Sequence, residues 1–251
     1  EWKQIFVGWE EVFAEKGWGT VYLGNHDMGR MVSRFGNDSE PYRELSAKML
    51  HSFILSMRGT PYIYNGDEVG MVNINLTSID DYRDLYTINY YHQLKSKGQD
   101  ADEFLKAHAP ISRDNARTPM QWDSSNQAGF TTGTPWLKVN ENYRSLNIAS
   151  QELDPNSVLH YFRRMMLLRK SSPALVYGKF SLEDPSNPQL FAYTRSLDDQ
   201  RWLIVLNFSD REASLCTSID TGKCVVRIGN YMDPAPMPVY RPYEAVVYEI
   251  N

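Results

Sequence analysis

A polar triplet, Asn25-His26-Asp27, directly follows a short apolar run bounded by glycines. The run, residues 20–24, is typical of a buried strand. Parallel barrels and open α/β sheets place their active sites at the carboxyl ends of such strands, so Asp27 is a candidate catalytic carboxylate. Position alone leaves two other interpretations open. Asp27 could form a turn or cap a helix, and His26 could be a structural histidine with its hydrogen bonds satisfied.

The strand before this triplet belongs to a repeated β/α pattern. Ser39-Glu40-Pro41 offers an N-cap and a proline at the first helical position, and the apolar face that follows predicts a helix as far as Met57. Gly59-Thr60-Pro61 leads into a second expected strand, Tyr62-Ile63-Tyr64, which ends in another polar group. Two successive units of this kind predict a parallel sheet with helices outside it.

Helical periodicity is also present before and after these units. Apolar residues recur at three- and four-residue spacing from Trp2 to Phe13, which indicates a helix already under way at the first residue and therefore a missing beginning. Further helices are expected over residues 79–96, 102–108 and 157–170. Between the last two lies a long irregular stretch. Loops of such length are usually functional, and its aromatic side chains suit a sugar or, alternatively, anchor the loop.

From Leu175 onward the period changes to that of β-strands, which predicts an antiparallel β domain of about 75 residues. Strands are expected at residues 190–193, 202–206, 224–227 and 245–248. We place the domain boundary between residues 172 and 173. Cys216 and Cys224 are interpreted as small buried side chains, although their spacing also allows one cross-strand disulfide.

Composition excludes several classes of protein. Of the 251 residues 42% are apolar and 13% aromatic, which excludes disorder. The net charge is −5 and no basic block exceeds Arg163-Arg164, so no nucleic-acid partner is expected. No apolar run is long enough to predict a membrane-spanning helix. The two cysteines and five scattered histidines form no metal-ligand pattern, so we expect neither a metal nor a cofactor.

Four motifs occur in order along the chain, and together they resemble the α-amylase family, glycoside hydrolase family 13. Leu23-Gly24-Asn25-His26-Asp27, with residues 32–38, is similar to the Asn-His-Asp region at the seventh barrel strand of that family. Residues 59–71 resemble the eighth strand. Residues 112–123, which include Ser112-Arg113-Asp114-Asn115, are typical of the oligo-1,6-glucosidase and α-glucosidase branch, and the similarity continues through Pro135-Trp136.

The resemblance implies both a fold and an activity. Residues 1–172 would form the C-terminal part of a catalytic (β/α)8 barrel, namely strands seven and eight with their helices, and residues 173–251 an antiparallel β-sandwich. The implied function is that of a retaining, exo-acting α-glucosidase that hydrolyses short oligosaccharides. Family members carry the nucleophile on strand four and the acid/base on strand five. Neither motif occurs here, so we expect this chain alone to be inactive without the N-terminal part of the barrel.

The resemblance also implies roles for single residues. Asp27 would be the third carboxylate, which stabilises the transition state, and His26 would contact the same sugar. Arg113 would close the pocket around the non-reducing glucose, where its usual partner is an aspartate from the first strand. Two positions depart from the family pattern and are expected on the leaving-group side. Arg30 follows Met28 and Gly29, and Tyr86 replaces a glutamate, although Tyr86 could instead face the core.

Two other functions fit the same resemblance. One is a non-catalytic family member, similar to the barrel-bearing subunits of amino-acid transporters. The other is a transglycosylating enzyme similar to sucrose isomerases, which would share the sugar-binding residues and differ in how water reaches the glycosyl intermediate. The β domain is expected to pack against the barrel rather than to bind carbohydrate. A cytoplasmic location is favoured.

Overall fold

The computed structural model describes residues 2–251, apart from the side chain of Glu15. The chain forms two compact units, each described separately below. The first unit contains the chain up to Tyr22, residues 39–62 and residues 161–251. The second unit contains residues 23–38 and 63–160. The predicted domain boundary between residues 172 and 173 stays a prediction.

In the first unit a short parallel pair of strands accompanies several helices. Strand β1, Thr20–Val21, pairs with β2, Thr60–Pro61, so the predicted parallel sheet is confirmed at these residues. The second strand, expected at residues 62–64, lies two residues earlier. Its residues pair with β1, and β1 ends at Val21. The helices are α1 (Trp2–Lys16), α3 (Arg43–Ser56) and α8 (Pro173–Tyr177), and α7 (Val158–Ser171) crosses into this unit at residue 161.

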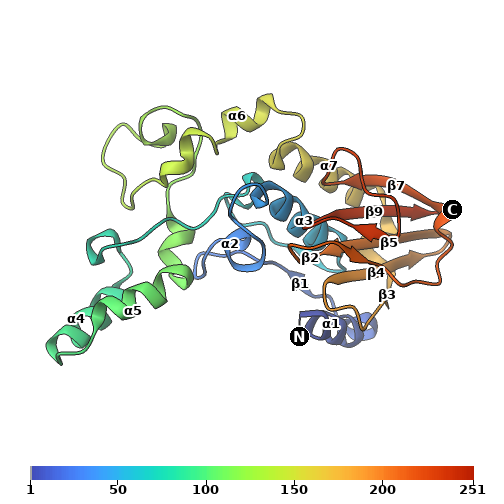
Figure 1. The fold of residues 1–251 in the computed structure, drawn as a ribbon, viewed down its shortest axis with the longest axis horizontal. Coiled ribbons are helices and arrows are strands. Elements are labelled where there is room, and N and C mark those ends of the chain that lie inside the picture. Colours follow the sequence, from blue (N-terminus) through green and yellow to red (C-terminus); the bar gives the residue numbers. More distant parts are fainter. Residues whose placement is uncertain (1) are drawn as a thin grey trace. The chain divides into compact units, whose positions relative to one another are not determined.

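Helix α3 begins at Arg43, not at Pro41 as its sequence suggests. The carbonyl of Ser39 accepts hydrogen bonds from the amides of Tyr42 and Arg43 at 2.9 and 3.0 Å, so residues 39–42 form a turn. From Ser46 to Ser56 every residue of α3 is buried, which is typical of a helix enclosed on all sides. Figure 1 shows α3 against the C-terminal sheet, where it contacts β5 and β9.

The C-terminal part of the first unit is an antiparallel sandwich. Its larger sheet has the order β3-β4-β5-β9-β7, and its smaller sheet pairs β6 with β8. One face of the larger sheet and the smaller sheet enclose a core that includes Leu203, Val205, Ala213 and Tyr240. The strands are β3 (Lys179–Glu183), β4 (Leu190–Leu197), β5 (Gln200–Asn207), β6 (Ala213–Ser214), β7 (Cys224–Gly229), β8 (Val239–Tyr240) and β9 (Ala245–Ile250).

The opposite face of the larger sheet packs on α3. The rings of Phe53 and Phe191 lie 5.8 Å apart, and the hydroxyls of Ser56 and Tyr193 are 2.5 Å apart. Strand β4 therefore buries residues on both faces, which explains why its first half, residues 190–193, is a continuous apolar run rather than an alternating one. This packing on α3 supports the first part of the expectation for the β domain, and the absence of carbohydrate binding stays a prediction.

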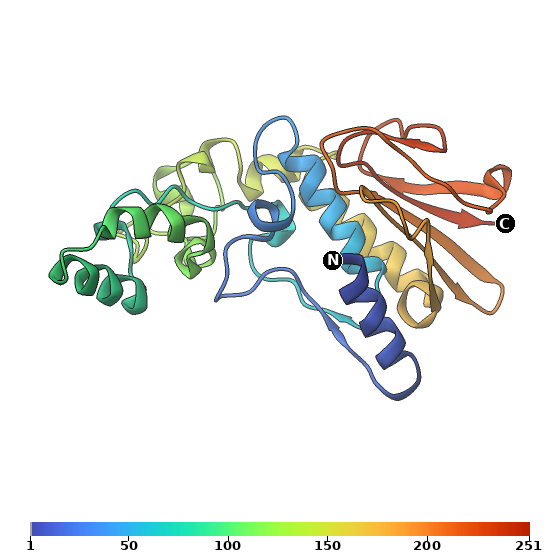
Figure 2. The same cartoon turned by 60° about the horizontal axis from the view of Figure 1, so that its bottom comes forward.

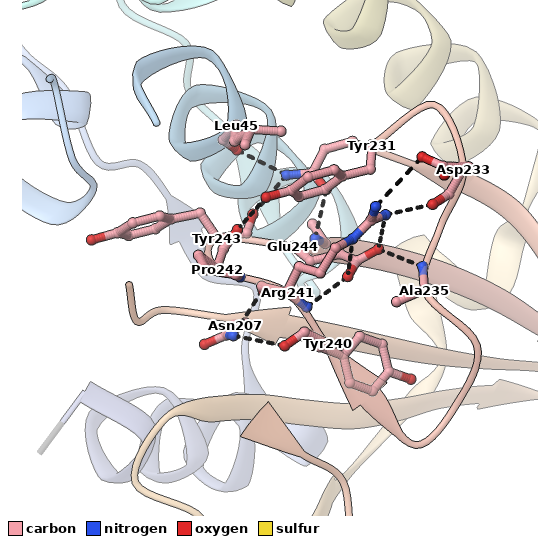
Figure 3. A network of polar contacts seen from close by, with 12 residues as sticks. Leu45, Asn207, Tyr231, Asp233, Ala235, Tyr240, Arg241, Pro242, Tyr243 and Glu244 are labelled. Atoms are coloured by element: carbon pink, nitrogen blue, oxygen red, sulfur yellow. Dashed lines mark hydrogen bonds and ion pairs between the residues drawn. The ribbon is translucent and has the colours of Figure 1, made fainter. Parts of the chain in front are cut away.

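A buried polar network secures the loop that precedes β9 (Figure 3). The carboxylate of Glu244 is fully buried and accepts hydrogen bonds from the amides of Ala235 and Arg241 at 2.8 and 2.7 Å and from the Arg241 guanidinium. The side-chain amide of Asn230 donates to the carbonyls of Leu45 and Tyr243 at 3.0 and 2.7 Å. Because Leu45 belongs to α3, the network links this loop to the helix beneath the sheet.

The two cysteines are free, and neither sequence interpretation holds for them. Cys216 is exposed, because it lies in the loop after β6, where its amide donates to the Asp184 carboxylate at 3.0 Å. Cys224 is half-buried at the start of β7, which pairs with β9 and not with β6. A cross-strand disulfide between them therefore does not form.

The second unit consists of short helices and loops around two small apolar clusters. One cluster contains Val69, Met71, Met120, Leu146 and Leu159, and the other contains Ile74, Leu76, Tyr82 and Leu105. Figures 1 and 2 both show α4 and α5 side by side, and the two helices are in contact. The α-helices are α2 (Met31–Phe35), α4 (Leu85–Ser96), α5 (Ala101–His108) and α6 (Ile148–Leu153).

The helix expected over residues 79–96 is divided in two. Ile79–Asp81 forms a single 3-10 turn, and α4 begins only at Leu85, because the Asp84 side chain caps it by accepting from the amide of Thr87. The stretch expected to be irregular, residues 109–154, contains α6 and several further 3-10 turns. No helix in the described part of the chain is long and apolar enough to cross a membrane.

Candidate active site

The second unit brings Asp27, His26 and Arg113 together. The Asp27 carboxylate lies 3.5 Å from Nη1 of Arg113 and 3.2 Å from Nε2 of His26, and its own side chain is 51% exposed. Its backbone amide donates to the Asn25 side chain at 2.9 Å, which gives the triplet a local turn. The turn is thus formed by the side chain of Asn25, which leaves the Asp27 carboxylate to face its cationic partners and solvent.

A second arginine, Arg117, holds the triplet in place. Its Nη2 donates to Oδ1 of Asp27 at 3.0 Å, and its Nε donates to the carbonyl of His26 at 2.9 Å. One guanidinium therefore fixes both the side chain of Asp27 and the backbone beside it. A planar fork with several donors is well suited to this double contact, which a lysine could not reproduce. The sequence interpretation of Arg117 as a residue that holds the loop is consistent with these bonds.

Arg113 is anchored by Asp84 at the start of α4. Its Nε donates to Oδ1 of Asp84 at 2.7 Å, and its Nη2 lies 2.5 Å from the same oxygen. This hydrogen bond raises the pKa of Arg113 above its ordinary value. Burial alone would raise the pKa of Asp84, but the hydrogen bonds from Arg113 and Thr87 outweigh it and keep that pKa below its usual range. Both groups are therefore charged at neutral pH.

Arg30 does not reach the surface of the site. Its side chain is 1% exposed, and its guanidinium donates to the carbonyls of Asn65 and Asn115 at 2.6 and 3.2 Å and to the Thr118 hydroxyl at 3.3 Å. Additional protein could only reduce that exposure, so a direct contact with the leaving group is excluded by burial. Arg30 instead links Asn65, which follows the second strand, with Asn115 and Thr118, which follow Arg113.

A buried carboxylate, Asp67, lies behind the triplet. A Cβ atom at Gly24 would come within 2.5 Å of Oδ2 of Asp67, so only glycine allows this approach. The amide of Tyr64 donates to the same oxygen at 3.2 Å. Burial raises the pKa of Asp67 to about 7, although nearby Arg30 acts in the opposite direction. Asp67 is 1% exposed, which places it behind the site and not on its surface.

Tyr86 lies on the exposed side of α4 and does not face the core. Its side chain is 61% exposed, and its ring is parallel to that of Tyr90, with 6.0 Å between the ring centroids. Tyr86 follows Asp84 by two residues, so it stands in the first turn of the helix whose cap binds Arg113. An exposed aromatic face at this place can stack on a sugar ring.

Sequence reasoning missed Asp84 as a member of the site. Its signal was available, because an aspartate three residues before a threonine at the start of a helical pattern is an N-cap pattern. The pairing of Asp84 with Arg113 had no such signal, since 29 residues separate the two along the chain. Among the residues that the structure describes, no group of three or more His, Cys, Asp or Glu side chains could hold a metal ion.

Comparison with known proteins agrees with this fold. The family model described as "Alpha amylase, catalytic domain" matches residues 1–178, and the one described as "Maltogenic Amylase, C-terminal domain" matches residues 180–233. The chain therefore belongs to the α-amylase family of glycoside hydrolases. Its fold is part of an α-amylase catalytic domain followed by an antiparallel β-sandwich, which confirms the fold class that the motifs predict.

Within the family, the chain is similar to oligo-1,6-glucosidases. It is 45% identical to the probable oligo-1,6-glucosidase 2 of Bacillus subtilis (strain 168), over 99% of this chain and 45% of that protein. It is 43% identical to the oligo-1,6-glucosidase of Parageobacillus thermoglucosidasius, with the same coverage. The trehalulose synthase from Pseudomonas mesoacidophila MX-45 superposes with a TM-score of 0.92 at 39% identity, over 99% of this chain and 46% of that one. The chain thus spans about half the length of these relatives.

Proposed function

We propose that this chain supplies the sugar-binding part of a retaining, exo-acting α-glucosidase that hydrolyses short oligosaccharides. The observation that carries the proposal is the half-exposed Asp27 carboxylate, which two arginines hold in one orientation. A fixed anion of this kind can accept hydrogen bonds from sugar hydroxyls and favour the positive charge that develops at the anomeric carbon. His26 and Arg113, on either side of Asp27, add hydrogen-bond donors for the same sugar.

The proposal assigns the remaining chemistry to another part of the protein. Retaining hydrolysis needs two carboxyl groups about 5–5.5 Å apart, one as nucleophile and one as acid/base. Asp27 would act beside that pair as the third carboxylate. The partner of this chain in catalysis is then the N-terminal part of the barrel, and its ligand is a small oligosaccharide. No cofactor or metal enters the proposed reaction.

The test is the substitution Asp27→Asn in the complete protein. Asparagine keeps the size of the side chain but removes the charge that stabilises the transition state. We expect kcat on isomaltose to fall at least about a thousandfold, which corresponds to roughly 4 kcal/mol. The matched control is Asp38→Asn, an exposed carboxylate in the same segment, which should leave kcat unchanged. If Asp27→Asn stays within tenfold of the wild type, the assigned role is wrong.

A second candidate, transglycosylation, is favoured by the similarity to a trehalulose synthase. Both activities would use Asp27, His26 and Arg113 to hold the glucosyl group, so the site residues do not separate them. Analysis of the reaction products distinguishes the two activities. Incubation with sucrose should yield glucose and fructose from a hydrolase, whereas an isomerising enzyme would yield a disaccharide of the same mass as sucrose.

A further inference from the structure

The guanidinium of Arg113 is held more tightly at one end than at the other. Nε and Nη2 lie 2.7 and 2.5 Å from Oδ1 of Asp84, whereas Nη1 lies 3.5 Å from Oδ1 of Asp27. We propose that Asp84 is the positioning residue that aims Arg113 at the sugar bound by Asp27. This inference rests on the proposed function, because it concerns how the same sugar is held.

Asp84 is itself fixed from several directions. Its Oδ2 accepts hydrogen bonds from the hydroxyl and the amide of Thr87 at 2.8 and 3.1 Å. The amides of Arg83 and Asp84 both donate to Oδ2 of Asp114, at 2.7 and 2.9 Å. Asp114 is fully buried, and Asp84 is only 4% exposed. The backbone and the side chain of Asp84 are therefore both restrained, as a positioning residue requires.

His108 extends the restraint from α5. Its Nε2 lies 2.9 Å from the Thr87 hydroxyl, and since that hydroxyl donates to Asp84, its oxygen accepts the Nε2 proton. The imidazole stacks on Phe104, with 5.2 Å between the centroids. Partial burial lowers the pKa of His108, although Asp84 and Asp114 act against this, so the ring is neutral at neutral pH. A continuous chain of hydrogen bonds thus leads from α5 through Thr87 and Asp84 to Arg113.

Among the described residues, Asp84 holds one end of Arg113 closely, and only the more distant Asp27 faces the other. Asp84 occupies the Nε edge and Nη2, while Nη1 faces Asp27 at a distance longer than the 2.7–2.9 Å of a charge-assisted hydrogen bond. A substrate hydroxyl that donates to Asp27 can therefore also accept a hydrogen bond from Nη1. Asp84 also balances the charge of Arg113. The two arginines beside Asp27 therefore do not both act as uncompensated cations on the sugar that Asp27 binds. Asp84 acts through Arg113 and needs no contact with the sugar.

The deciding experiment is a double-mutant cycle in the complete protein with Asp84→Asn and Arg113→Ala. We expect Asp84→Asn to lower kcat/KM for isomaltose about thirtyfold, mainly through KM, because a misdirected Arg113 weakens sugar binding. In the Arg113→Ala background the same change should alter kcat/KM less than threefold. A purely structural Asp84 would instead lower kcat/KM equally in both backgrounds, and that result would overturn the inference.

Two further variants test the inference even if Asp84→Asn fails to fold. Thr87→Val removes the hydroxyl bond to Asp84 but keeps its charge, and should lower kcat/KM about threefold to fivefold in the wild type and not in Arg113→Ala. The control Asp80→Asn, an exposed carboxylate near the same turn, should change nothing. Thr87→Val with unchanged kinetics would contradict the inference even if Asp84→Asn failed to fold. The proposed function is judged separately, since it fails only if Asp27→Asn remains active.

Discussion

Asp67 shows how one buried carboxyl group makes the stability of the protein depend on pH. Its pKa is raised to about 7 in the folded protein, mainly by burial, against 3.8 in the unfolded chain. Between these values the folded state holds a proton that the unfolded state has lost, so the contribution of Asp67 to stability is greatest below pH 4 and is lost as the pH rises through 7. The cost arises because ionisation would place a charge at a position that is 1% exposed, near the charge of Glu68.

We therefore expect Asp67→Asn to remove this pH dependence. Asparagine resembles the protonated carboxyl and retains an oxygen for the Tyr64 amide. Relative to the variant, the free energy of unfolding of the wild type should fall by roughly 3 kcal/mol between pH 5 and 8. Urea unfolding of both proteins across this range measures the difference. Parallel stability profiles would mean that Asp67 titrates normally.

At the scale of elements, the start of α4 carries both a residue that binds Arg113 and an exposed aromatic side chain. Its cap, Asp84, binds Arg113, and two residues later Tyr86 presents an exposed ring that is parallel to the ring of Tyr90. The first turn of α4 thus carries both the support for Arg113 and an exposed aromatic ring, which the family resemblance predicts on the leaving-group side. A shift of α4 by one residue would displace both.

We expect Tyr86→Ala to raise KM for isomaltose several-fold, because a stacking surface for the leaving sugar is lost. Activity on α-glucosyl fluoride should stay the same, since fluoride needs no sugar site as a leaving group. Steady-state kinetics on the two substrates measure this split. Tyr177→Ala, which removes another exposed ring, is the control. Equal losses on both substrates would show that Tyr86 has a structural role.

At the scale of the whole molecule, the network around Glu244 connects the C-terminal sandwich to α3 within the first unit (Figure 3). Glu244 is fully buried and accepts bonds from Arg241, whose side chain is 27% exposed, and from the partly buried Ala235 amide, so its removal leaves both donors without that acceptor. A hydrogen bond to a charged group contributes more to stability than one between neutral groups.

Glu244→Ala should therefore lower the free energy of unfolding by about 1.5–3 kcal/mol. The exposed pair of Asp210 with Arg211 provides the contrast, since Asp210→Ala should cost less than about 0.5 kcal/mol. Denaturant unfolding of both variants measures the two effects. Similar small losses in both would mean that the network does not secure the loop before β9.

The sequence by itself determined the fold class, the parallel pairing of two β/α units, and the strands of the sandwich that are long and apolar. Apolar periodicity reports burial directly, which is why α3, β4 and β5 were predictable. Strands β6 and β8 were not, because each has only two residues and is defined by its partner rather than by its own pattern. The triplet at Asp27 and the Arg113 motif could likewise be found, because each is local.

Only the tertiary structure decided how these residues are used. Arg30 and Arg113 are the same type of residue, yet one is buried among carbonyls and the other faces a half-exposed carboxylate. The support of Arg113 by Asp84, Thr87 and His108 joins segments 21 to 29 residues apart. Hydrogen bonds between distant residues depend on where the chain folds back, and that depends on packing over the whole unit, whereas periodicity and turn patterns depend only on neighbours along the chain.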